Sequence, residues 1–200
     1  EHRLPRLVRE EEIRGAFHLH TTRSDGRATL EQLAAAAQQR GWSYLGISDH
    51  SRTAFYAGGL KPEAVREQLR EIAEFNAAHP EFRIFAGIES DILPDGSLDY
   101  DEELLAEFDF VIGSVHSSFT MPEAAMTGRI ATAMRNPYLT MLGHPTGRLL
   151  LARDAYAVDL NEIIRVAAAT QTILEINASP YRLDLDWRWC GQAKTAGVIL

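Results

Sequence analysis

The sequence has a single cysteine, Cys190, among its 200 residues. One thiol cannot form a disulfide within the chain or supply a cysteine cluster for zinc, so a disulfide framework and a zinc finger are excluded. Apolar runs are short, and none approaches the roughly 20 residues that a transmembrane helix needs. The first 14 residues are highly charged and lack the apolar segment of a secretory signal peptide. We therefore expect a globular, cytoplasmic protein with no membrane partner.

Positive charge is also scarce. The chain has 28 acidic and 20 basic residues, which gives a net charge of −8, and only Lys61 and Lys194 are lysines. This balance argues against a domain that coats nucleic acid with a basic surface. It does not exclude a polyanionic substrate, because bound cations would supply the missing positive charge. The arginine bias fits bidentate contacts to phosphate or carboxylate, and equally fits genome composition or heat adaptation.

Short apolar runs alternate with longer helical patterns, as a parallel α/β fold requires. The predicted strands are 15–20, 44–48, 84–88, 110–115, 140–143, 173–176 and 198–200. The predicted helices are 29–40, 62–78, 101–107, 122–135, 159–169 and 187–196. The glycine-rich phosphate turns of dinucleotide-binding and P-loop folds are absent. Seven strand–helix units in this length favour a TIM-like (βα)7 barrel over an open sheet.

Two segments follow from this pattern. Residues 1–14 are predicted to be a linker or lead-in, and residues 15–200 a single domain. The last apolar run stops at Leu200, where a natural chain end is unusual. We therefore expect a domain that is truncated at its C-terminal end.

Polar residues end six of the predicted strands. They are His18 and His20, Asp49 and His50, Glu89, His116, His144, and Asn177, in chain order. All strand carboxyl ends lie on one face of a parallel barrel, so these side chains should converge there. Since His18 and His20 are two residues apart, they point to the same side of a regular strand. The other histidines, His2 and His79, are predicted to lie on the surface.

This convergence predicts a metal centre. A lone histidine at a strand end is usually a core or capping residue, but five of them with Asp25, Asp49 and Glu89 would be costly to bury without a shared cation. Imidazole and carboxylate without thiolate suit zinc, manganese or iron. The candidates outnumber the four ligands of one tetrahedral ion, which favours two or three metals.

The motifs at these strand ends resemble those of the PHP (polymerase and histidinol phosphatase) superfamily. They are His18-x-His20-Thr21 with Ser24-Asp25-Gly26, Ser48-Asp49-His50-Ser51, Gly87-x-Glu89, Ser114-Val115-His116 and Gly143-His144-Pro145. Four further stretches are similar to the C-terminal PHP domain of bacterial family X DNA polymerases. They are Asp91-Ile92 with 95–100, then 144–150, then Glu175-Ile176-Asn177-Ala178, then Arg182-Leu183-Asp184-Leu185.

The resemblance implies a distorted seven-stranded barrel with a trinuclear centre. The implied activity is a manganese-stimulated 3′→5′ exonuclease that acts on DNA 3′ ends, in some members with endonuclease activity at abasic sites. Its implied partners are the polymerase domains upstream in the same chain. The implied metal ligands are His18, His20 and Glu89 for one ion, Glu89, His116 and His144 for a second, and Asp25 and His50 for a third. The family's last motif, Asp-x-His, would follow Leu200, and without it the first and third ions each lack one ligand.

The expected reaction is hydrolysis of a phosphodiester by a metal-bound hydroxide, with the cations stabilising the developing charge. Supporting groups would be His116, Glu89, Arg148 and Arg182. The two arginines either clamp phosphate or form surface ion pairs.

Four residues near these motifs have open interpretations. Asp49 either binds metal or orients a neighbouring histidine. Asn177 either contacts a metal-bound water or holds its own loop. Phe55 and Tyr56 either stack on a terminal base or pack their loop.

Two other functions remain open at the sequence level. One is a small-molecule phosphomonoesterase of the histidinol phosphatase type. The other is a metal-stabilised scaffold without catalytic activity that supports a polymerase.

Overall fold

The computed structural model describes residues 6–200. Residues 1–5, which include His2 and the start of the predicted lead-in, lie outside the described residues. Residues 6–14 are exposed and contain the short 3₁₀ helix η1 (Glu10–Glu12). Within the described chain, no helix has both the length and the hydropathy for a membrane span.

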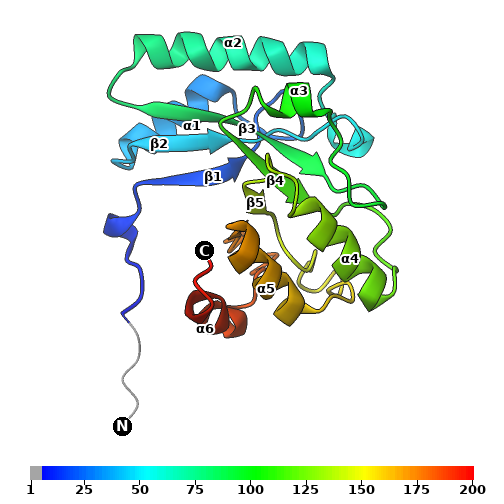
Figure 1. Ribbon diagram of the computed structural model, residues 1–200. Coiled ribbons are helices and arrows are strands. Elements are labelled where there is room, and N and C mark those ends of the chain that lie inside the picture. Colours follow the sequence, from blue (N-terminus) through cyan, green and yellow to red (C-terminus); the bar gives the residue numbers. More distant parts are fainter. Residues whose placement is uncertain (1–5) are drawn as a thin grey trace.

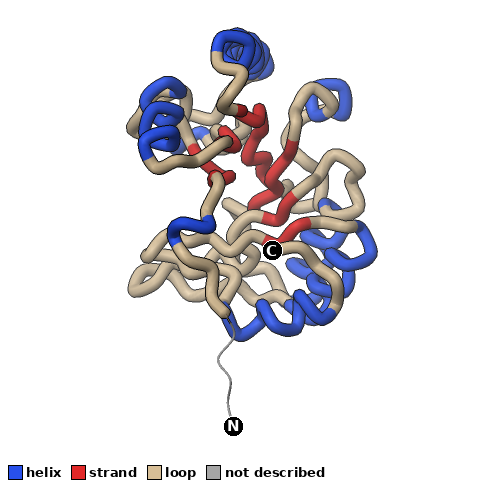
Figure 2. The backbone as a smooth tube through the Cα atoms, turned by 90° about the vertical axis from the view of Figure 1, so that its left-hand side faces the viewer, coloured by secondary structure: helices blue, strands red, loops and turns tan. Residues whose placement is uncertain are grey.

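Six parallel strands form one sheet in which neighbours follow the chain order. They are β1 (Gly15–Leu19), β2 (Tyr44–Ile47), β3 (Arg83–Asp91), β4 (Phe110–Ser114), β5 (Met141–Leu142) and β6 (Ile173–Leu174). Figure 2 shows these strands as a curved row through the middle of the molecule. The sheet therefore has the form of an open half-barrel.

The predicted seventh strand is not formed within residues 6–200. Residues 198–200 have no strand assignment, although the Leu174 amide donates to the Ile199 carbonyl at 3.0 Å. Three residues with one hydrogen bond to β6 do not make the repeated ladder that defines a strand. The curled, parallel α/β arrangement agrees with the prediction, whereas a seventh strand is not confirmed within the described residues.

Within residues 6–200, six α-helices connect and cover the strands (Figure 1). They are α1 (Leu30–Gln39), α2 (Pro62–Ala78), α3 (Glu102–Leu105), α4 (Glu123–Ala133), α5 (Leu160–Thr170) and α6 (Trp187–Thr195). The Thr29 and Gln32 side chains form the predicted capping box of α1, and Gly41 follows its end with φ 72°. Asp159 caps α5, as predicted. A second 3₁₀ helix, η2 (Phe55–Ala57), was not predicted.

Two apolar clusters hold the helices against the sheet. One joins β2 and β3 to α1 and α2 through residues such as Leu45, Ile72 and Ile84. The other joins β3–β6 to α3–α5 and includes Ile112 and Ile130. All five side chains are at most 2% exposed, so the strands rest on a packed core. This packing fixes the positions of the strand carboxyl ends.

Candidate metal centre

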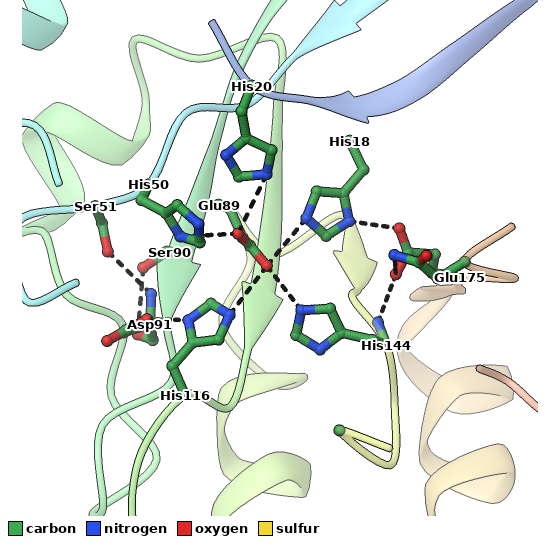
Figure 3. A network of polar contacts seen from close by, with 12 residues as sticks. His18, His20, His50, Ser51, Glu89, Ser90, Asp91, His116, His144 and Glu175 are labelled. Carbon is green, nitrogen blue, oxygen red and sulfur yellow. Dashed lines mark hydrogen bonds and ion pairs between the residues drawn. The ribbon is translucent and has the colours of Figure 1, made fainter. Parts of the chain in front are cut away.

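Five histidines from the carboxyl ends of four strands surround the carboxylate of Glu89 (Figure 3). Glu89 lies on β3 and is 1% exposed. The histidines are His18 within β1, His20 just after it, His50 beyond β2, His116 beyond β4 and His144 beyond β5. Because all the strands are parallel, their carboxyl ends bring these side chains to one face, as the sequence predicts.

Both oxygens of Glu89 contact imidazole nitrogens. Oε1 lies 3.0 Å from His18 Nε2, 3.0 Å from His144 Nε2 and 3.3 Å from His116 Nε2. Oε2 lies 3.0 Å from His50 Nδ1 and 3.5 Å from His20 Nε2. One carboxylate is thus shared by five rings.

Asp25 joins the cluster from the loop after β1. Its Oδ1 lies 3.3 Å from His20 Nδ1 and its Oδ2 lies 3.6 Å from His50 Nε2. The Asp25 side chain is 52% exposed, so it forms the solvent side of the cluster. The structure therefore brings all seven residues that the resemblance implies as ligands into one group.

The backbone that carries two of the histidines is unusual. His18 has φ 64° and His144 has φ 23°, although both are L residues with a Cβ. The β1–β2 register shifts between Ala16 and Leu19, so β1 is bulged at His18. His18 and His20 both contact Glu89, but through this bulge rather than through the regular alternation that the sequence analysis assumed. Positive φ at non-glycine residues is costly and is concentrated at functional sites.

Two acidic residues that were not predicted as site residues orient histidines from outside the cluster. The His18 Nδ1 group contacts Glu175 Oε1, and the His144 amide donates to Glu175 Oε2 at 2.5 Å. His116 Nδ1 lies 2.5 Å from Asp91 Oδ1. The sequence held a signal for each: Glu175 is a charge inside an apolar strand pattern, and Asp91 lies two residues after Glu89. A carboxylate on the far nitrogen fixes the ring orientation and tautomer of a histidine ligand.

Burial and the neighbouring carboxylates together shift the pKa values of four of these histidines. Burial works against protonation of His18, but Glu89 and Glu175 together raise its pKa to about 10. Burial also opposes protonation of His116, while Glu89 and Asp91 raise its pKa to about 9. Burial lowers the pKa of His20 and of His144. Some rings thus carry a proton and others offer a free lone pair.

The donor set fits divalent cations. Among the described residues, the buried Nδ1 atoms of His20, His50 and His144 have no hydrogen-bond partner. His50 Nδ1 is 3.0 Å from Glu89 Oε2 but lacks the geometry of a hydrogen bond. Two triads that share Glu89, namely His18–Glu89–His144 and His20–His50–Glu89, place their ligand atoms within 4.8 Å of one another. Nitrogen and oxygen donors without sulfur suit zinc, manganese or iron.

The two arginines singled out by the sequence have different surroundings. Arg148 donates to the carbonyls of Arg182 and Leu183 and to Asp186, so it holds the loop before α6. The Arg182 NH1 group is buried and has no hydrogen-bond partner within residues 6–200. Arg182 also lines the same cavity as the histidines, so its guanidinium is the better placed of the two to meet a bound anion.

Asp49 and Asn177 both hold loops. Asp49 is fully buried and accepts hydrogen bonds from the Thr21 amide and hydroxyl, Ser24 Oγ and Gln68 Nε2. None of these partners is a histidine, so the predicted contact of Asp49 with a ring is not present. Asn177 accepts from the Ser179 amide and donates to Glu175, which agrees with the loop interpretation.

A cavity of about 980 Å³ opens onto the cluster. Its polar end is lined by the histidines, Asp25, Glu89, Glu175 and Arg182. Its apolar end runs along the inside of the half-barrel past Phe17 and Ile173.

Comparison with known proteins identifies the family. A model of the PHP domain matches residues 16–179, which is most of the chain. This chain belongs to the PHP domain family. The resemblance inferred from the strand-end motifs is therefore confirmed.

Two curated relatives share this PHP domain. The chain is 43% identical over 194 residues to the DNA polymerase/3′-5′ exonuclease PolX of Bacillus subtilis, which covers 97% of this chain and 34% of that protein. It is 28% identical over 170 residues to a probable phosphatase of Syntrophotalea carbinolica, which covers 82% of this chain and 65% of that protein. The chain thus spans about a third of the length of the first relative and about two thirds of the second.

A solved structure shares the fold of this PHP domain. It is a histidinol phosphate phosphatase from Lactococcus lactis, crystallised with zinc, L-histidinol and phosphate. The TM-score is 0.52 at 18% sequence identity, and the match covers 82% of this chain and 72% of that chain. This match supports the α/β, barrel-like fold class.

Proposed function

We propose that residues 15–200 form a metal-dependent phosphodiesterase domain that removes nucleotides from DNA 3′ ends in the 3′→5′ direction. The proposed context is a family X DNA repair polymerase, with polymerase domains upstream in the same chain and residues 1–14 as the lead-in. Cleavage at abasic sites is a second proposed activity. The observation that carries this proposal is the sharing of Glu89 by five histidines, with Asp25 at the solvent side.

Three groups of residues would hold two or three manganese, zinc or iron ions. As the resemblance implies, they are His18, His20 and Glu89; Glu89, His116 and His144; and Asp25 with His50. The two triads whose ligand atoms lie within 4.8 Å of one another instead pair His18 with His144 and His20 with His50 around Glu89. Bound divalent cations would supply Lewis acidity for a phosphoryl oxygen and for a water molecule.

The chain's own residues complete the site. Glu175 and Asp91 hold His18 and His116 in fixed orientations, so the nitrogens that face Glu89 stay free to coordinate. Arg182 lines the cavity, and its guanidinium, whose NH1 group has no hydrogen-bond partner within residues 6–200, would donate to a non-bridging phosphate oxygen. The positive charge of Arg182 would partly offset the negative charge of the acidic side chains beside a bound phosphate.

A DNA substrate is favoured by the extent of the similarity to PolX. That similarity covers nearly the whole chain at 43% identity, whereas the probable phosphatase matches at 28%. The phosphatase relative and the fold of the histidinol phosphate phosphatase favour the second candidate, a phosphomonoesterase. The third candidate, a scaffold without catalysis, is disfavoured by the convergence of all seven implied ligands of the described chain on one group.

The substrate test uses the natural full-length protein with manganese. A 5′-labelled duplex with a recessed 3′ end and p-nitrophenyl phosphate are assayed in parallel. We expect stepwise shortening of the labelled strand from its 3′ end. Turnover of the monoester with an intact DNA strand would instead establish the phosphomonoesterase.

A substitution at His116 distinguishes the catalytic function from the scaffold function. His116→Ala should lower nuclease activity by at least about 100-fold, because it removes a proposed ligand, with only a modest loss of thermal stability. His79→Ala is the matched control, since His79 stacks on Phe75 away from the cluster. Full activity in the His116 variant would favour the scaffold.

A further inference from the structure

A short turn beside the metal centre exposes two aromatic side chains. The 3₁₀ helix η2 (Phe55–Ala57) follows His50, and its Phe55 and Tyr56 are 85% and 72% exposed. Large aromatic side chains normally bury most of their surface. Neither ring is needed to pack the loop, because the residues that anchor it are different ones.

The turn is held firmly by its neighbours. Ala54 and Ala57 are buried and point into the protein. The Thr53 amide donates to Asp99 Oδ2 at 2.8 Å, and the Thr53 hydroxyl donates to Asp91 Oδ2 at 2.8 Å. Gly58 closes the turn with φ 70°, a conformation that glycine adopts without strain. The exposed rings are therefore presented by a fixed backbone.

Tyr56 lies at the rim of the metal centre. Its ring centroid is 6.2 Å from that of His50 and 6.3 Å from that of His116, at interplanar angles of 60° and 77°. The rings meet edge to face, so neither imidazole stacks on Tyr56. Tyr56 is 72% exposed, so most of its ring is free to stack on a ligand at the rim of the histidine cluster.

A nucleobase fits this position by its chemistry. Only the sugar separates a base from its own phosphate, so a phosphate at the metal centre brings the adjoining base to the rim. A flat, uncharged ring is a sequence-tolerant platform, because each base has a π-face. The chain is short of the basic residues that would otherwise track a nucleic-acid backbone. Stacking would thus supply affinity that charge does not.

We propose that Tyr56 is the stacking platform for the base of the 3′-terminal nucleotide. This inference rests on the proposed nuclease function and adds a residue that selects the substrate. Phe55 lies on the same turn without a ring contact to the histidine cluster in the described structure, and it serves as the matched control.

The experiment compares two duplexes with recessed 3′ ends, one ending in a normal nucleotide and one ending in a tetrahydrofuran abasic analogue. The wild-type protein should show a KM roughly 10-fold lower for the end that carries a base, within the range typical of base–aromatic stacking. Tyr56→Ala should abolish this preference, while Tyr56→Phe and Phe55→Ala should retain it. Because the phenylalanine variant keeps the ring and loses the hydroxyl, it separates stacking from hydrogen bonding.

Three results would overturn the proposal: a preserved preference in Tyr56→Ala, its loss in Tyr56→Phe, or its equal loss in Phe55→Ala. A binding measurement that needs no turnover separates this proposal from the nuclease function. Calorimetry compares a deoxynucleoside monophosphate with deoxyribose 5-phosphate, in the presence of manganese. A base preference that disappears in Tyr56→Ala supports the platform even if DNA is not cleaved. DNA cleavage without any base preference rejects the platform alone.

Discussion

At the scale of single residues, Glu89 is a buried carboxylate that five imidazole rings contact. It is 1% exposed, and the nearby His18 and His116 hold its pKa well below the usual range despite its burial. Burial of ionised groups is tolerated when they are paired or coordinate a metal. Shared cations would satisfy the carboxylate and the imidazole nitrogens that face it.

Removing the charge of Glu175 tests the orientation of His18. Glu175→Gln should weaken metal binding by roughly 10- to 100-fold, because the amide is a poorer partner for the imidazole than the carboxylate. Metal content after dialysis and calorimetric titration measure the effect. Glu162→Gln is the control, since Glu162 pairs with Arg165 on the surface. Equal affinities in the two variants would contradict the assigned role.

Substitution of the two arginines should change different quantities, KM for Arg182 and Tm for Arg148. Arg182→Ala should raise KM by about 10-fold or more with little change in Tm, since Arg182 lines the cavity and its NH1 group makes no hydrogen bond within residues 6–200. Arg148→Ala should mainly lower Tm, since Arg148 holds backbone carbonyls and Asp186. Steady-state kinetics and thermal unfolding check both. The reverse pattern would show that Arg148 is the phosphate-binding group.

At the scale of helices, strands and loops, the loops that follow the strands position the residues of the proposed metal centre. The loop after β1 carries Asp25, and Asp49 at the end of β2 ties it down through Thr21 and Ser24. The η2 turn is tied to β3 in a similar way, through the Thr53–Asp91 hydrogen bond. Buried carboxylates thus act here as anchors for loops as well as partners for histidines.

Asp49→Asn tests this anchoring. The variant replaces an acceptor oxygen with an NH₂ group that faces existing donors, so we expect a loss of about 1–3 kcal/mol in the free energy of unfolding. Metal affinity should fall as well, because Asp25 lies on the loop that is released. Denaturant unfolding and metal titration measure the two effects, with Asp154→Asn as an exposed control. An unfolding free energy like that of the wild type would mean that the loop does not need this anchor.

At the scale of the whole molecule, the net charge does not show where the acidic residues lie. A net charge of −8 argues against a basic DNA-binding surface, but part of that charge surrounds the proposed metal centre. Divalent cations would reverse the local charge and attract phosphate there. The cavity that opens onto this centre is lined by residues of β1 and β6 as well as by the histidines.

The metal-free protein should lose stability as the pH rises above neutral. His18 and His116 have pKa values of about 10 and about 9 in the folded state, against an ordinary value of 6.5. A raised pKa in the folded state stabilises it fully below pH 6.5, and this stabilisation disappears as the pH rises through 9 to 10. Each of the two protons contributes at most about 1.4 kcal/mol per pH unit in that window.

Urea unfolding with a chelator present, over that pH range, measures this loss. With metal added in place of the chelator, the trend should reverse, because metal binding displaces the protons from His18 and His116 and so strengthens with pH. A flat or rising stability of the chelated protein would contradict the proposed charge state of the two histidines.

Much of the fold could be predicted because its signals are local. The range of α2 (Pro62–Ala78) matches the prediction, since a proline start and a regular apolar pattern mark it. The Thr29 capping box is also a matter of adjacent residues. The bulge at His18 could not be predicted, because it depends on hydrogen bonding between strands.

The sequence by itself determined the alternation of strands and helices, the family, and the placing of histidines where strands end. Only the tertiary structure decided that Glu89 is the shared centre, that Glu175 orients His18 from 157 residues away, and that Arg182 rather than Arg148 faces the cavity. The reason is physical: periodicity and caps act over a few residues, whereas partners across a curled sheet meet only when the whole sheet has packed.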